Sequence, residues 1–436
     1  MFAYYLNLAL RSFKRNPMLT VLMVIAIALG IGASMTTLTV FHVLSGDPIP
    51  HKSDKLFYPQ LEPRPLANGA RPEPEPMEQM TRFDAEALLR QKRGDLQAVM
   101  TAGSLTMQPE GGMQPFRAQA RYTSADFFAM FEPPMVAGRG WTAAEDEARA
   151  RIAVIGRKLA EKMFGDANAV GRELRTPKAT FRVIGVIDEW ELNPRFYDLS
   201  HQRFSGTEQV FVPFSSAMDA RLRSQGQMNC WGDSRQEEGG SQSLNAPCAW
   251  LQYWVQLDTP QKVADYRKYL ADYSDQQRRA GRFEQPTNVR LRSVMEWLDY
   301  KGVVPGDVRM QMWLAFGFLL VCLVNTIGLL LAKFLRRSGE IGVRRALGAS
   351  RKEIFKQCLV EAGCIGAAGA VLGLGFAALG LWLVRQQPDD YARLAQLDAP
   401  MLLTTFVLSL AASLIAGVFP AWRAMQIAPA IQLKSQ

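Results

Sequence analysis

The sequence contains four long stretches that lack every charged residue. Although 21% of the 436 residues are Asp, Glu, Lys or Arg, none of these occurs in residues 16–46, 310–332, 362–384 or 399–422. The stretches are 31, 23, 23 and 24 residues long, and a helix needs about 20 apolar residues to cross a bilayer core. A fifth charge-free stretch, residues 239–257, contains Gln, Asn and Pro and is too polar for a span. The four stretches exclude an ordinary soluble enzyme, a disordered protein and a disulfide-stabilised mini-protein.

Motifs for catalysis and metal binding are also missing from the sequence. Lys precedes Ser or Thr only at Lys52 and Lys434, and neither has the upstream glycines of a phosphate-binding P-loop. The histidines His42, His51 and His201 have no partners at metal-ligand spacing, and no G-x-S-x-G nucleophile motif occurs. No carboxylate lies in the four stretches, which disfavours a proton-coupled carrier. We therefore expect no catalytic residue, no metal site and no cofactor bound by this chain.

The segments between the charge-free stretches differ in charge. Residues 1–17 hold three basic residues and no acid, residues 333–357 hold eight basic and two acidic residues, and residues 423–436 hold two basic residues and no acid. Because short basic loops stay in the cytoplasm, we expect both termini and residues 333–357, called the inner loop below, to lie inside. The net charge of +9 is then explained by the orientation of the chain in the membrane and by contact of its basic segments with anionic lipid headgroups, rather than by binding to nucleic acid.

The resulting fold class is a membrane protein with four transmembrane α-helices and a large α+β extracytoplasmic domain inserted between the first two. The expected parts are a cytoplasmic amphipathic helix at 1–17, transmembrane helices at 18–44, 310–332, 358–384 and 401–422, an outer domain at 45–309, the inner loop at 333–357, a short outer loop at 385–400 and a cytoplasmic tail at 423–436. The first span is expected to be an uncleaved signal anchor, because its charge-free stretch is about twice as long as a signal-peptide core. The alternative for residues 1–17 is a cytoplasmic extension of this span.

The outer domain has the pattern of a soluble α+β fold. Eight prolines between Pro48 and Pro76 preclude a regular helix in its first part. The residue patterns predict strands at 151–155, 180–187, 209–212 and 250–257, and helices at 157–164 and 259–279. Residues 221–247 are rich in Gly, Ser, Gln and Asn and are expected to form a loop or insertion.

Two of the five cysteines lie in the outer domain, and the other three lie in or beside the spans. If that side of the membrane is oxidising, Cys230 and Cys248 are expected to form a disulfide, because they are the only two thiols there. The alternative is two free thiols.

The third span holds six glycines, which include Gly366, Gly369 and Gly373. Small residues let membrane helices approach closely, so these three are expected to be helix-packing positions. Packing among the last three spans of one chain is favoured over a dimer interface.

The inner loop contains the most specific motif of the chain. Residues 337–355 have the sequence R-S-G-E-I-G-V-R-R-A-L-G-A-S-R-K-E-I-F, which strongly resembles the cytoplasmic signature of MacB/FtsX-type ABC transporter permeases. Residues 9–17 resemble the start of this family before its first span, and residues 417–429 resemble its exit from the fourth. Residues 124–171 are similar to its periplasmic core domain, whereas the resemblance is weakest at 195–259.

This resemblance implies a four-helix permease that works as a dimer, with an identical or related second permease subunit and two cytoplasmic ATPase subunits. MacB itself carries a fused ATPase, and this sequence has no P-loop, so we expect a separate ATPase that binds ATP and Mg. The chain itself would be a non-catalytic subunit in the bacterial inner membrane, with its large domain in the periplasm.

The inner loop is expected to dock in a groove of the ATPase as a short helix. Ser350 can cap a further helix that starts near Arg351, with Glu353 in its first turn. The residues expected to couple the two subunits are Glu340, Ile341, Arg344, Arg345, Leu347, Gly348, Arg351 and Ile354. The alternative is a basic loop that contacts only lipid headgroups.

We therefore expect a permease that transmits ATP-driven movement through its second span to the outer domain, for export of a periplasmic substrate or extraction of a lipid-anchored protein. Export would add a periplasmic adaptor and an outer-membrane channel as partners. One alternative is an FtsX-like regulator of a cell-wall hydrolase, and another is a membrane sensor without an ATPase.

Overall fold

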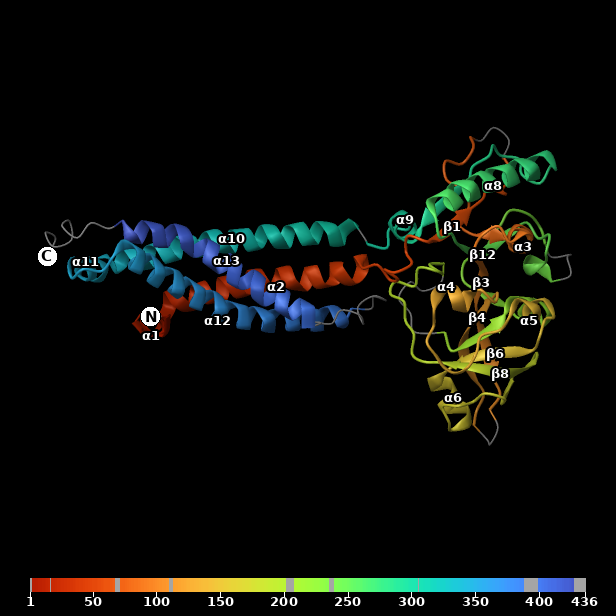
Figure 1. Cartoon of the computed structure of the whole chain (residues 1–436), viewed down its shortest axis with the longest axis horizontal. Helices are drawn as coiled ribbons and strands as arrows, with labels where there is room; N and C mark the ends of the chain where they lie inside the picture. Colours follow the sequence, from red (N-terminus) through yellow and green to blue (C-terminus); the bar gives the residue numbers. More distant parts are fainter. Residues whose placement is uncertain are drawn as a thin grey trace. The chain divides into compact units, whose positions relative to one another are not determined.

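A computed structural model describes residues 2–15, 17–66, 71–109, 113–200, 208–234, 239–304, 306–387 and 399–426. The chain divides into two compact units (Figure 1). The first, called the helical unit, comprises Met1–Gly46 and Val304–Gln436, and the second, called the mixed unit, comprises Asp47–Val303.

The helical unit contains the four expected spans. Among the described residues, four helices are long and apolar enough to cross a membrane, and they lie within α2 (Pro17–Ser45), α10 (Gly306–Arg336), α12 (Arg351–Arg385) and α13 (Ala399–Met425). Helix α12 packs against α2 and α13, and α10 packs against the same two helices. Large apolar side chains remain exposed on the outside of these helices, as at Trp313, Leu320 and Val371. Such a surface suits contact with lipid rather than water.

Two further helices belong to this unit. Helix α1 (Phe2–Arg15) packs against α12, with Ala9 and Ser12 buried, so one face of the expected amphipathic helix is covered by protein. Helix α11 (Ser338–Ala346) occupies the inner loop. The expected outer loop at 385–400 and the expected tail at 423–436 lie largely outside the described residues.

The third span packs against the first span, which differs from the expected packing among the last three spans alone. A Cβ atom on Gly369 of α12 would lie 2.7 Å from Ile27 Cγ2 of α2, and one on Gly373 would lie 3.1 Å from Ile31 Cγ2. Gly366 is buried on the same helix. Helix α13 covers another part of α12, where a Cβ on Gly417 would lie 2.5 Å from Ala362 Cβ. Sequence periodicity identified the small residues but not the helix that meets them.

The mixed unit is built on a sheet, whose principal strand order in the described residues is β13-β1-β12-β3-β4-β9-β6-β8-β5. The strands are β1 (Leu56–Gln60), β2 (Met80–Thr81), β3 (Leu96–Met107), β4 (Phe116–Thr123), β5 (Met135–Gly138), β6 (Ile152–Gly156), β7 (Glu173–Arg175), β8 (Thr180–Ile187), β9 (Val210–Pro213), β10 (Ser224–Gln225), β11 (Asn229–Cys230), β12 (Cys248–Gln256) and β13 (Arg290–Ser293). The helices are α3 (Arg82–Gln91), α4 (Phe127–Phe131), α5 (Ala143–Glu147), α6 (Arg157–Phe164), α7 (Phe214–Asp219), α8 (Pro260–Arg279) and α9 (Val294–Tyr300), with a 3-10 turn η1 (Gly240–Gln242).

The sheet buries apolar side chains on both faces. Successive strand residues point to opposite faces, and in β12 Tyr253 joins the core that contains Leu88 of α3 and Leu270 of α8. The neighbouring Trp254 joins a second core, with Phe131 of α4. Burial on both sides explains why β12 is apolar or aromatic at most positions instead of alternating.

The expected elements of this unit agree with the structure apart from residues 221–247, and the described residues of the Pro-rich start contain no helix, as expected. The predicted helices at 157–164 and 259–279 are α6 and α8, and the predicted strand at 180–187 is β8. The Pro-rich start contains an internal strand, β1, because its neighbours β12 and β13 supply pairing partners on both sides. The expected loop at 221–247 contains β10, β11 and η1, of which β11 forms by pairing with β12.

Candidate functional site

Helix α11 lies between the second and third spans and is joined to α12 by a tight turn. It ends at Ala346, and its C-cap residue Leu347 is followed by Gly348, which has a backbone φ of +102°. This conformation is readily available only to glycine. The turn therefore depends on Gly348, one of the residues that the sequence motif predicts for coupling to the ATPase.

The start of α12 is fixed by the predicted cap. Ser350 Oγ accepts a hydrogen bond from the Glu353 backbone N–H at 3.2 Å, and the Ser350 backbone N–H donates to Glu353 Oε2 at 2.8 Å. This capping box satisfies two backbone donors that the helix itself leaves free. Because of it, α12 begins at Arg351, seven residues before the expected start of the third span.

The predicted apolar coupling residues divide into buried and exposed groups. Ile341 and Ile354 are buried in the core of the helical unit, so their side chains hold α11 and α12 in place and do not form an outer docking surface. Leu347, by contrast, is 83% exposed, and Val343, a further apolar residue of the same motif, is 51% exposed. These two lie four residues apart, about one helical turn, and present an apolar surface.

Three of the four predicted charged coupling residues, Glu340, Arg344 and Arg345, are bound within the helical unit, whereas Arg351 is exposed. Glu340 accepts hydrogen bonds from Arg337 at 3.2 Å and from Arg344 at 3.3 Å. Arg344 also donates to Gln357 Oε1 of α12 at 3.0 Å, and Arg345 donates to the Met425 carbonyl of α13 at 3.5 Å. Their immediate role in the structure is therefore to tie α11 to the spans.

Sequence reasoning missed a buried charge cluster that includes Arg337, the residue directly before α11. Glu361 of α12 is 2% exposed, and its carboxylate forms ion pairs with Lys333 Nζ of α10 at 2.7 Å and with Arg337 Nη1 at 3.2 Å. The Ser12 hydroxyl of α1 donates to the same carboxylate, and Lys333 also donates to Thr20 Oγ1 of α2 at 3.3 Å. The positions of two of these charges in the sequence could have indicated the cluster. Lys333 directly follows one charge-free stretch, and Glu361 directly precedes another and falls within the expected third span.

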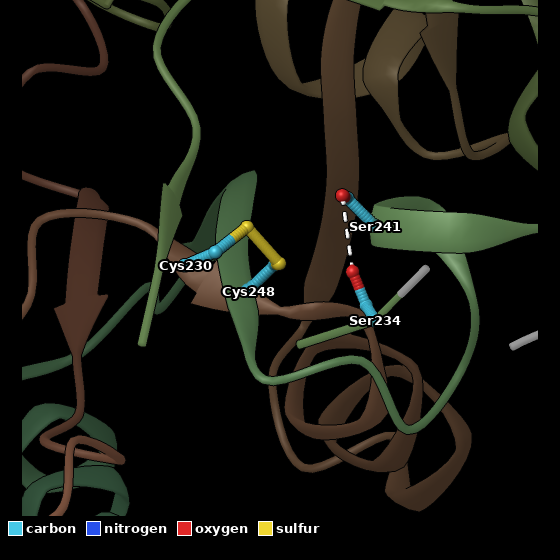
Figure 2. Close-up of a disulfide and its surroundings, with 4 residues drawn as sticks. All are labelled: Cys230, Ser234, Ser241 and Cys248. Carbon is cyan, nitrogen blue, oxygen red and sulfur yellow. Dashed lines mark hydrogen bonds between the residues drawn. A yellow bond between two sulfur atoms is a disulfide. The ribbon is translucent and has the colours of Figure 1, made fainter. Parts of the chain in front are cut away.

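The mixed unit contains the disulfide. Cys230 and Cys248 are bonded, and they are directly opposed residues of the antiparallel strands β11 and β12. Figure 2 shows this bond together with Ser234 and Ser241, whose hydroxyl oxygens lie 3.1 Å apart on the same connection. The predicted disulfide is thus present, and it closes the connection between the two strands.

A second buried charge cluster lies inside the mixed unit. The Arg121 guanidinium of β4 is fully buried, donates to Asp198 Oδ2 at 2.6 Å and also pairs with Glu208. Burial alone would raise the pKa of Glu208, but the charges of Arg121 and Arg195, with hydrogen bonds from Arg121 and Tyr197, lower it to about 2. The cluster is fully paired, so it stabilises the fold rather than offering a reactive group.

The mixed unit also has an open cleft of about 780 Å³, lined in part by α3, α5 and α7. Its wall carries both charge signs, including Arg90, Arg149, Asp126 and Asp146. The side chain of Asp146 is largely buried there, which raises its pKa, and it accepts a hydrogen bond from the Ser215 hydroxyl at 2.7 Å. Among the described residues, no group of three or more His, Cys, Asp or Glu could hold a metal ion, and His201 lies outside them.

Comparison with protein families gives two matches. Residues 20–273 match the MacB-like periplasmic core domain, and residues 312–429 match the FtsX-like permease C-terminal domain. The first match includes α2 and most of the mixed unit, and the second contains α11, α12 and Glu361.

Individual relatives are more distant. The chain is 24% identical over 325 residues to the pyoverdine export ATP-binding/permease protein PvdT of Pseudomonas aeruginosa, which covers 74% of this chain and 43% of the relative. It is 22% identical over 383 residues to the macrolide export ATP-binding/permease protein MacB of Syntrophobacter fumaroxidans, which covers 81% of this chain and 52% of the relative. The chain thus spans about half the length of these curated relatives.

Among solved structures, the periplasmic region of MacB from Actinobacillus actinomycetemcomitans matches with 16% identity and a TM-score of 0.35. This match covers 56% of the chain and 92% of that structure.

Proposed function

Since the chain belongs to the ABC transporter permeases that combine a MacB-like periplasmic core domain with an FtsX-like permease domain, we propose that it transmits ATP-driven movement from a cytoplasmic ATPase to its mixed unit. In this proposal the permease chain is not itself catalytic. ATP and Mg are bound by a separate ATPase dimer, and two permease subunits, identical or related, complete the complex.

The orientation in this proposal follows the distribution of basic residues. The inner loop carries eight basic and two acidic residues, and short loops with such an excess stay in the cytoplasm. In the proposal, α11 therefore lies on the side of the nucleotide. The mixed unit and its disulfide are then on the opposite, periplasmic side, where disulfides persist.

The observation that carries the proposal is the construction of α11. Val343 and Leu347 expose an apolar surface, while Glu340, Arg344 and Arg345 bind the same helix to its neighbours. A docking element that only touched lipid headgroups would not need such rigid attachment. An exposed apolar surface on a firmly held short helix suits insertion into a protein groove, so that movement of the partner displaces the spans.

Export is the activity that the relatives support best. Two of the similar proteins are named for export of pyoverdine and of macrolides. We propose that the mixed unit acts on a periplasmic substrate, together with a periplasmic adaptor and an outer-membrane channel.

The docking surface can be tested with Leu347→Asp and Val343→Asp in the full chain. Fully burying a Leu side chain is worth about 1.5–3 kcal/mol, and about 1.4 kcal/mol corresponds to tenfold in affinity. We therefore expect each variant to bind the ATPase at least about tenfold more weakly while still inserting into the membrane. Affinity is measured by titrating the purified ATPase against the permease in nanodiscs.

Val170→Asp is the matched control, because Val170 is a similarly exposed valine in the mixed unit. It should leave ATPase binding unchanged. Wild-type affinity in both the Leu347 and Val343 variants would refute docking at α11. Failure of the native membrane to yield any P-loop ATPase with the wild-type chain would refute the transporter assignment altogether.

A further inference from the structure

The cluster of Lys333, Arg337 and Glu361 joins elements that are far apart in the sequence. Lys333 lies near the end of α10, Arg337 lies between α10 and α11, and Glu361 lies in α12. Two more polar partners, Ser12 of α1 and Thr20 of α2, complete it. Helices α1 and α11 lie toward the same end of the four long helices (Figure 1). Four helices (α1, α2, α10 and α12) and the junction between α10 and α11 therefore meet at one carboxylate and two cations.

The guanidinium of Arg337 connects two carboxylates on two different helices. Its Nη1 donates to Glu361 Oε2 at 3.2 Å and to Ser12 Oγ at 3.0 Å, whereas its Nη2 donates to Glu340 Oε1 of α11 at 3.2 Å. A guanidinium is planar and rigid. A displacement of Glu340 would therefore tilt or pull the Arg337 guanidinium, which also binds Glu361. A lysine ammonium is a compact point charge and would not link the two carboxylates in this rigid way.

The surroundings of the cluster are apolar. Phe334, Ile341 and Cys358 are buried nearby in the same core, and the Lys333 ammonium lies 5.1 Å from the centre of the Phe13 ring. In such a dry environment ion pairs are strong, and leaving one of the charges without its partner is costly. A displacement that separated these charges from their partners would therefore carry this cost. Apolar packing can hold helices together without buried charges. The ion pairs therefore contribute chiefly by fixing how the helices are positioned relative to one another.

We propose that Glu361 is a positioning residue that transmits displacement of α11 to α10 and α12 through Arg337 and Lys333. This inference rests on the proposed function, because it requires that an ATPase moves α11. In this inference the movement passes from Arg344 and Glu340 of α11 to Arg337. Arg337 then displaces Glu361 of α12, and Glu361 displaces Lys333 of α10.

The test compares wild type, Glu361→Gln and Arg337→Lys as full chains in nanodiscs with their ATPase. Hydrogen exchange is measured with and without ATP plus vanadate, separately for α11 and for the spans α10 and α12. In wild type, nucleotide should change protection in all three helices. In Glu361→Gln the response of α11 should persist, while the response of α10 and α12 should fall by at least about fivefold, the lower end of typical coupling between sites.

Arg337→Lys keeps the positive charge but removes the planar guanidinium. It should likewise retain the response of α11 and lose that of α10 and α12, and it provides the test even if Glu361→Gln is not recovered from the membrane. Arg336→Lys is the matched control, because Arg336 is the exposed neighbour and should behave as wild type. Responses of α10 and α12 equal to wild type in the recovered variants would overturn the inference. A wild-type complex in which α11 itself does not respond to nucleotide would instead refute the proposed function.

Discussion

Gly369 of α12 lies directly against Ile27 of α2, where a Cβ atom would be only 2.7 Å from Ile27 Cγ2 and 3.0 Å from its Cβ. The first and third spans can approach this closely because Gly369 has no side chain. Contacts of the same kind recur at Gly373 with Ile31 and at Gly380 with Thr36. Gly369, Gly373 and Gly380 therefore form the seam that joins the N-terminal span to the C-terminal half of the chain.

The first prediction concerns this seam. Gly369→Ala should lower the thermal stability of the purified chain in detergent, because overpacking typically costs about 1–3 kcal/mol. Gly375→Ala on the same helix is the control, since a Cβ there meets no atom within 4 Å. It should leave the midpoint unchanged or raise it, because Ala favours helix. Equal loss of stability in both variants would show that the seam is not tightly packed.

The second prediction concerns the turn between α11 and α12. Gly348 has a φ of +102°, and Ala in such a conformation costs about 1–3 kcal/mol. Gly348→Ala should therefore lower the thermal midpoint and weaken ATPase binding together, because α11 loses its orientation. Gly328→Ala in α10, where a Cβ meets nothing within 4 Å, is the control. Normal ATPase binding by the Gly348 variant would show that docking does not depend on the conformation of this turn.

The third prediction concerns the disulfide. Closing a loop of 18 residues stabilises a folded chain by about 3 kcal/mol in the chain-entropy treatment. Cys230→Ala with Cys248→Ala should lower the denaturation midpoint of the mixed unit and change mobility on non-reducing gels. Reductant should lower the wild-type midpoint to that of the variant and leave the variant itself unchanged. Insensitivity of the wild type to reductant would contradict a stabilising role.

The fourth prediction is a pH dependence that arises from Glu208. Its pKa is lowered from 4.5 to about 2 in the folded state, so the folded protein favours the carboxylate more than the unfolded chain does. The resulting stability is present above about pH 4.5 and is lost as the pH falls toward 2. It amounts to about 3 kcal/mol at neutral pH, since one pKa unit corresponds to about 1.4 kcal/mol.

Glu208→Gln should accordingly unfold more readily in urea at pH 7, by about 3–5 kcal/mol, because it leaves Arg121 partly unpaired. The difference from wild type should shrink between pH 4.5 and 3 in tryptophan fluorescence of the full chain. Glu147→Gln serves as the control, because its side chain is exposed. A difference that is constant with pH would show that the carboxylate charge at Glu208 is not what stabilises the cluster.

Several features of the fold could be predicted because they depend on local patterns. The capping box of Ser350 and Glu353 and the Thr259-Pro260 start of α8 are local hydrogen-bonding motifs. The disulfide between Cys230 and Cys248 followed from elimination, because no other thiol lies outside the spans. In each case, neighbouring residues or simple counting carried the information.

Other features could not be predicted because they depend on which distant segments meet. Lys333 and Glu361 appear in the sequence as ordinary charges at the ends of two spans, and only the packing of α10 against its neighbours turns them into a buried pair. Likewise, Ile341 and Ile354 have the composition of a docking surface, yet they are buried in the helical unit. Apolarity shows that a side chain avoids water but does not show what covers it.

Amino-acid order alone determined that the described part of the chain has four helices long and apolar enough to cross a membrane, a large domain between the first two and a basic loop with a family motif, because a bilayer imposes length and charge rules on any chain that crosses it. Only the tertiary structure decided that the third span meets the first, that Leu347 and Val343 remain exposed, and that Glu361 binds Lys333 and Arg337. These outcomes depend on contacts between residues far apart in the chain, for which a single sequence contains no local rule.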